Sequence, residues 1–188
     1  MEGFGALNRV LKLYYLHQLL AFGEEFTHDI LMPPKTQTRT ESLGQNPKDA
    51  RIGFITKTPL LDSQGNFLPK QSGEILQKII ANVFKLNPKK CSILSFFKTD
   101  VITNQSMSED AQYRKLLLTQ ISQSTAKVFI IFDLQIANIL LATDIKQGVP
   151  CVYGQKTFIA THSLTALLKL PALKRETFAD LNTAKEFL

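Results

Sequence analysis

The side chains of this 188-residue chain that could take part in chemistry are lysines, hydroxyls and a histidine that follow predicted buried strands. An imidazole such as that of His162 can move protons near neutral pH. Lysines such as Lys57 could contact phosphates, and the ring of Phe67 could stack on an unpaired base. The candidate pocket residues are Thr56, Lys57, Phe67, Ser95, Lys98, Thr161, His162, Ser163 and Lys169.

Each of these candidates also has a purely structural interpretation. His162 could be an ordinary polar residue of a loop, and Phe67 could pack beneath its own loop. The lysines could simply be solvated, while Phe96 and Phe97 are expected in the core. The sequence leaves both interpretations open, with His162 as the one weak candidate for a catalytic group.

Other familiar site chemistries have no counterpart in the sequence. The loop at residues 57–73 contains neither Gly-Lys-Ser/Thr nor Gly-x-Gly-x-x-Gly, so nucleotide hydrolysis and dinucleotide binding are disfavoured. Two cysteines, Cys91 and Cys151, cannot make a disulfide framework or a four-thiolate metal site. We therefore expect no metal and no cofactor.

Strand and helix patterns alternate along most of the chain. The sequence predicts strands at 51–56, 91–97, 127–133, 150–153 and 157–161, and helices at 72–84, 106–122, 134–142, 164–170 and from Pro171 to 188. Such alternation predicts a three-layer α/β domain, whose mainly parallel sheet carries helices on both faces. Ligands of these sheets bind beyond the carboxyl ends of the strands, which is where the candidate residues lie.

The first 50 residues have a different character. Residues 7–22 show helical apolar spacing, so we expect residues 1–32 to form an amphipathic helix with an extension. This helix could pack on the domain or dock to another protein. Residues 33–50 are poor in large apolar side chains and are interpreted as a flexible linker that precedes an α/β domain at 51–188.

Two stretches of the domain resemble the uracil-DNA glycosylase superfamily, particularly its family 4 enzymes. The first contains Gly65-Asn66-Phe67-Leu68, Ser72-Gly73 and Ile75-Leu76. The second runs from Thr161 to Lys169 and is similar to the Thr-x-His-Pro-Ser-x-Leu-Leu-Arg ending of the family. Residues 129–141 and 95–98 fit the segments between them, so the resemblance covers about 51–181.

The resemblance implies a degenerate catalytic set. The acidic, aromatic, asparagine and histidine positions of the family fall on Ile55, Leu68, Ser95 and Ser163. A shift of one residue would bring Phe67 or His162 into place, but no such shift supplies the acid, because Asp62 aligns with the second acidic position. The central cluster cysteines of the family fall on Thr99 and Tyr113, so no iron–sulfur cluster is expected.

Three functions follow as expectations. The first is a catalytically degenerate, glycosylase-like protein that binds DNA (single-stranded or uracil-containing) or a protein of DNA repair or replication. The second is an active, divergent glycosylase that uses His162. The third is a protein-interaction module similar to the psi subunit of the bacterial DNA polymerase clamp loader, which combines a small α/β domain with an N-terminal partner-binding segment.

Charge and hydropathy set the remaining expectations. Lys+Arg 22 against Asp+Glu 16 gives a net charge of +6, which permits a polyanionic partner. No apolar run reaches the roughly 18 residues that span a bilayer, and the N-terminus has no basic region typical of a secretory signal. We therefore expect a cytoplasmic protein that does not associate with membranes.

Overall fold

The computed structural model describes residues 44–98 and 107–188. The predicted N-terminal helix and residues 33–43 of the predicted linker lie outside the described residues. The described residues belong to one compact unit.

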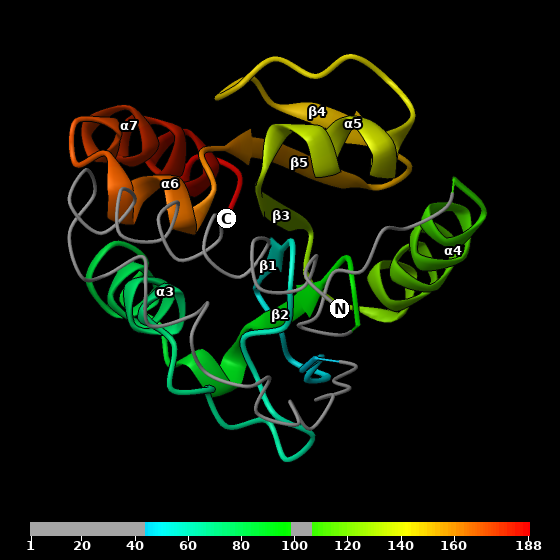
Figure 1. The fold of residues 1–188 in the computed structure, drawn as a ribbon, viewed down its shortest axis with the longest axis horizontal. Helices are drawn as coiled ribbons and strands as arrows, with labels where there is room; N and C mark the ends of the chain where they lie inside the picture. The colour runs from blue at the N-terminus through cyan, green and yellow to red at the C-terminus, as the bar shows by residue number, and fades with distance from the viewer. Residues whose placement is uncertain (1–43, 99–106) are drawn as a thin grey trace, which may run out of the picture. The chain divides into compact units, whose positions relative to one another are not determined.

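The centre of the domain is a five-stranded sheet with the order β2-β1-β3-β5-β4. Its strands are β1 (Ile52–Thr56), β2 (Ser92–Ser95), β3 (Val128–Phe132), β4 (Cys151–Tyr153) and β5 (Lys156–Thr161). Strands β2, β1, β3 and β5 are parallel, and only the edge strand β4 is antiparallel (Figure 1). The predicted mainly parallel sheet is confirmed.

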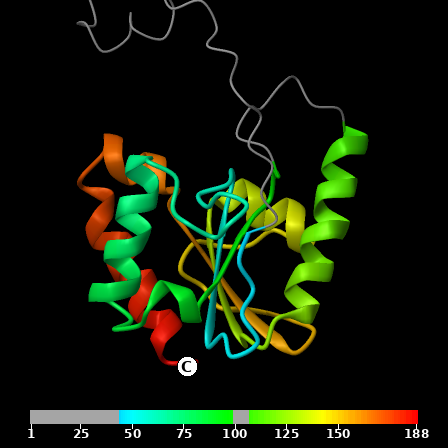
Figure 2. The same ribbon diagram turned by 90° about the horizontal axis from the view of Figure 1, so that it is seen from below.

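Helices cover both faces of the sheet. They are α3 (Gln71–Asn82), α4 (Met107–Gln123), α5 (Leu134–Leu141), α6 (Leu164–Lys169) and α7 (Leu173–Lys185), with a short 3-10 turn, η2 (Pro88–Lys90). Helices α3, α6 and α7 pack on one face, and α4 and α5 pack on the other, which gives three layers (Figure 2). In the described part of the chain no helix is long and apolar enough to cross a membrane.

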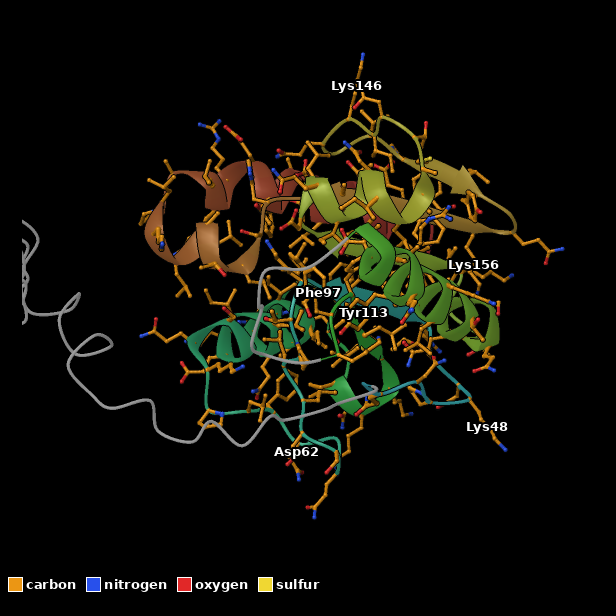
Figure 3. The ribbon with its side chains drawn as sticks, turned by 45° about the vertical axis from the view of Figure 1, so that its right-hand side comes forward. Lys48, Asp62, Phe97, Tyr113, Lys146 and Lys156 are labelled. Atoms are coloured by element: carbon orange, nitrogen blue, oxygen red, sulfur yellow. The ribbon has the colours of Figure 1, made fainter. Side chains whose placement is uncertain are left out.

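Alternation along the central strands divides the core into two clusters. In β3, Val128 and Ile130 face α3, α6 and α7, whereas Phe129 and Ile131 face α4 and α5. Because both faces of β3 are covered, its sequence is a continuous apolar run rather than an alternating one. Phe97 lies on the α4 side, where its ring meets the ring of Tyr113 edge to face at 5.5 Å between centroids (Figure 3).

The end of the predicted linker is part of the domain. Gln45 pairs with Ile93 in an antiparallel bridge, and its side-chain amide donates to the carbonyl oxygens of Pro88 at 2.8 Å and Cys91 at 3.0 Å. Ala50 is buried in the core. Residues 44–50 therefore belong with the sheet, because their backbone and amide groups bond to it although they carry few large apolar side chains.

Gly53 lies in β1 where the ring of Phe129 crosses the strand. A Cβ atom at Gly53 would stand 2.1 Å from Cε1 and 2.2 Å from Cδ1 of Phe129. The ring is completely buried and stacks on Phe158 at 5.6 Å between centroids, so it has no room to withdraw. Only glycine fits at this point of the sheet.

We predict that Gly53→Ala lowers the free energy of unfolding by about 1–3 kcal/mol or more, because the added methyl overpacks a filled core. Phe129→Leu removes the obstructing ring edge. The double variant should therefore be more stable than the sum of the single effects implies, by roughly 1 kcal/mol. Urea unfolding of the four proteins measures this coupling, and strictly additive effects would show that the ring does not exclude a side chain at Gly53.

Candidate functional site

A pocket of about 310 Å³ opens at the carboxyl ends of β1 and β3, and we call it the strand-end pocket. It is lined by Thr56, Lys57, Thr58, Leu60, Lys70, Ser72, Phe132, Asp133, Ser163, Leu164 and Thr165. These residues come from the loop after β1, the start of α3, the end of β3 and the start of α6. The parallel topology brings these segments together, because parallel strands end at one edge of the sheet.

Two polar groups of the strand-end pocket serve as helix caps. Asp133 Oδ1 accepts the backbone N–H groups of Gln135 at 2.9 Å and Ile136 at 3.2 Å, which caps α5. Ser163 Oγ accepts the N–H of Ala166 at 3.1 Å, which caps α6. These hydrogen bonds satisfy backbone donors that the first turn of a helix leaves unpaired.

The remaining polar groups give the strand-end pocket a weakly cationic character. Lys57 and Lys70 carry its positive charges, and Asp133 is the only carboxylate among its lining residues. The Thr56 hydroxyl donates to the carbonyl oxygen of Thr58 at 2.9 Å. Ammonium groups beside hydroxyls suit an anionic or strongly polar group, such as a phosphate. In the described part of the chain no three histidine, cysteine, aspartate or glutamate side chains come together as metal ligands would.

Sequence reasoning found part of this pocket. Thr56, Lys57 and Ser163 line it as candidates from the sequence. Lys70 and Asp133 were not among the candidates. The sequence could have indicated Asp133, because it immediately follows a predicted buried strand. It could not have indicated Lys70, because only the path of the long loop after β1 brings this residue to the pocket.

Thr161 and His162 belong to a separate polar network beside α7. The buried Thr161 hydroxyl donates to Asp180 Oδ2 at 2.6 Å, and the Gln147 amide donates to the same oxygen at 3.2 Å. His162 Nε2 lies 2.8 Å from the Gln147 amide nitrogen and 3.0 Å from Glu176 Oε2. His162 is not among the residues that line the strand-end pocket. The network ties the end of β5 to α7, which is a structural role.

Lys98 lies on the α4 side of the sheet, whereas the side chain of Ser95 lies on the other face of β2, beside Leu60 and Ile93. Lys98 is 7% exposed, and its Nζ donates to the carbonyl oxygen of Ser95 and to Gln120 Oε1, the latter at 2.7 Å. Burial lowers the pKa of Lys98 to about 8. Lys98 is thus not the solvated or phosphate-facing lysine that the sequence suggested, because its ammonium group turns inward to backbone and amide oxygens.

The loop after β1 folds on itself, and it contains Asp62 and Phe67, which the sequence analysis considered as site residues. Leu61 and Phe67 pair in an antiparallel bridge, and the half-buried Phe67 packs against the core on the α3 side. Asp62 lies in this loop (Figure 3). Its Oδ1 accepts the N–H groups of Asn66 and Gln64, both at 2.8 Å, and the bond from Asn66 lowers the pKa of this carboxyl group. Neither Asp62 nor Phe67 lines the strand-end pocket. Lys169, another candidate, is exposed at the end of α6 and does not line the pocket either.

We predict that Lys98 makes the protein more stable as the pH rises from 7.5 to 9.5. Its pKa is about 8 in the folded chain against 10.5 for an ordinary lysine, so the unfolded chain binds more protons in this window. The unfolding free energy of the wild type minus that of Lys98→Met should grow by about 2 kcal/mol over this interval. The raised pKa of the Cys91 thiol acts in the opposite direction, but equally in both proteins, and so cancels.

Urea unfolding at several pH values provides the measurement. Lys115→Met is the matched control, because Lys115 is exposed on α4, and its difference from the wild type should stay constant with pH. An equally constant difference for Lys98→Met would refute the burial of its charge.

Comparison with models of known protein families finds no match for this chain, and a search of curated proteins finds no relative. The geometry of the site is therefore the basis for any inference about function.

Proposed function

We propose that this chain is a non-catalytic protein with a uracil-DNA glycosylase-like fold, which acts by binding within a DNA replication or repair assembly. The proposal rests on one observation, which is that polar groups at the strand ends form hydrogen bonds within the protein. Asp133 and Ser163 cap helices, and His162 is held by Gln147 and Glu176 outside the strand-end pocket. His162, the one candidate for a catalytic group, is therefore not among the described residues that line the pocket.

The requirements of base excision support the same conclusion. A glycosylase must hold an extruded base against an aromatic face and stabilise the leaving group. The aromatic ring among the lining residues is Phe132, which is 1% exposed and stacks on Phe54 with 6.3 Å between centroids. Phe67 packs against the core instead. A flipped base would therefore find no exposed aromatic ring among the described lining residues.

The psi subunit of the bacterial DNA polymerase clamp loader offers a precedent for such a protein. It combines a small α/β domain of related fold with an N-terminal partner-binding segment and lacks glycosylase chemistry. In this chain the described residues belong to one compact unit, and the sequence before them carries the amphipathic pattern of residues 7–22. We propose that residues 1–38 bind a protein of the replication or repair machinery.

Nucleic-acid binding is the second candidate function. Lys57 and Lys70 in the strand-end pocket favour it, together with the net charge of +6. In this role the strand-end pocket would hold a backbone phosphate rather than a base.

We predict that the purified protein releases no uracil from single- or double-stranded oligonucleotides. The product yield should equal that of His162→Ala, because His162 is hydrogen-bonded away from the pocket. Strand cleavage at abasic sites after alkaline treatment measures release. Any release that His162→Ala abolishes would establish the active glycosylase instead.

The same oligonucleotide separates the two binding functions. A mobility shift that weakens steeply with salt, and is lost in Lys57→Glu but not in Lys115→Glu, would favour nucleic-acid binding. The absence of a shift supports the protein-binding function. Lys98→Glu is unsuitable for this purpose, because it places a carboxylate in a buried position.

We predict that deletion of residues 1–38 abolishes association with the clamp-loader assembly of the same cell while the domain stays folded. The deletion must end before residue 44, because Gln45 bonds to the chain beside β2 and Ala50 lies in the core. Size-exclusion chromatography of the mixed components measures association, and circular dichroism with thermal unfolding checks the fold. Undiminished association of residues 39–188 would rule out a binding role for the first 38 residues.

A further inference from the structure

A second concave surface lies on the α3 side of the domain and shares no lining residue with the strand-end pocket. It is a groove of about 320 Å³ between α3 and α7, with Leu167 of α6 among its lining residues, and we call it the α3–α7 groove. Its apolar walls are formed by Ile75, Ile79, Val83, Phe178 and Leu181. Phe178 is 53% exposed, although a phenylalanine of this size is usually withdrawn from water.

The charged residues of α7 are divided between two sides of the helix. Glu176 and Asp180 turn toward the end of β5, where they bond to His162 and Thr161. Lys174 lies on the groove side, across from Lys78 of α3. The lining of the groove therefore contains two lysines and no carboxylate, and within the described part of the chain neither ammonium group takes part in an ion pair.

Thr177 adds an unsatisfied polar group to this apolar surface. Thr177 lines the α3–α7 groove and is 2% exposed, and its Oγ1 has no hydrogen-bond partner among the described residues. Buried hydroxyls in folded proteins are nearly always hydrogen-bonded. Because this oxygen is buried, the features of the groove that a partner can contact are its apolar walls and its two lysines. They are complementary to a segment that is apolar on one side and acidic at its borders.

We propose that the α3–α7 groove binds an acidic amphipathic helix of a partner protein. Its apolar stripe would lie against Ile79 and Phe178, and its carboxylates would face Lys78 and Lys174. Helix α3 has 12 residues and is about 18 Å long, which matches a partner helix of about three turns. This inference rests on the proposed function, since it assigns a second contact of the same binding protein to its folded domain.

The test uses the full-length chain and a fluorescein-labelled, three-turn amphipathic peptide. The peptide carries leucines at i, i+3, i+4 and i+7 with glutamates on both flanks, and a second peptide has lysines in place of the glutamates. Fluorescence anisotropy should show binding of the acidic peptide at least about tenfold tighter than of the basic one. Lys78→Glu/Lys174→Glu should reverse this preference, and Phe178→Ala should weaken both peptides about tenfold.

Matched controls lie on the opposite face of the domain. Lys115→Glu and Leu116→Ala alter exposed residues of α4 and should leave the affinity unchanged. Thr177→Val should raise the midpoint of thermal unfolding of the free chain, because it removes an unpaired buried hydroxyl. A lower midpoint would mean that this hydroxyl is already hydrogen-bonded in the free chain.

Three results would overturn the proposal. The first is that the chain binds both peptides equally or binds neither of them. The second is a dimer of this chain that Phe178→Ala converts to a monomer. The third is oligonucleotide binding that Lys78→Glu/Lys174→Glu abolishes. The second result would mean that another copy of this chain occupies the groove. The third would mean that a nucleic acid occupies it. Failure here is distinguishable from failure of the proposed function, because the peptide assay reads the α3–α7 groove whereas the deletion assay reads residues 1–38.

Discussion

The close contact between Gly53 and Phe129 is the constraint on which the rest of the domain depends. The Phe129 ring lies directly over β1, stacks on Phe158 and carries the Lys156 ammonium group at 5.3 Å from its centroid. Lys156 in turn donates to the carbonyl oxygens of Ser124 and Ala126, both at 2.7 Å. One glycine thus allows three neighbouring strands to share a single packed layer, and the parallel ends of these strands then fall at one edge of the sheet, where the strand-end pocket forms.

Polar groups at this edge are largely used for structure. Asp133 caps α5 and Ser163 caps α6, while Thr161 bonds to Asp180 of α7. Each of these hydrogen bonds fixes the direction in which the chain leaves the sheet. A glycosylase would require groups at the same edge that are free to meet a substrate. The proposal of a binding protein follows from this difference in how the strand ends are used.

The two sides of α7 have different surroundings. Its carboxylates at Glu176 and Asp180 hold the helix to the end of β5. Its opposite side presents Lys174 and Phe178 to the α3–α7 groove. Because these acidic groups lie on the side of α7 next to the end of β5, the lining of the groove is left apolar and cationic. The composition of α7 does not predict an apolar, cationic groove, because the helix contains both acidic and basic side chains.

The sequence by itself determined the alternation of strands and helices and the class of the sheet, because continuous apolar runs such as β3 are buried on both faces in any arrangement that folds. It also located Thr56, Lys57 and Ser163, since residues after parallel strands meet at one edge. Only the tertiary structure decided that Lys98 turns inward, because its partners lie in the β2 backbone and on α4. The α3–α7 groove likewise arises from two helices about 90 residues apart in the chain, and local patterns carry no information about which helices will lie across from one another.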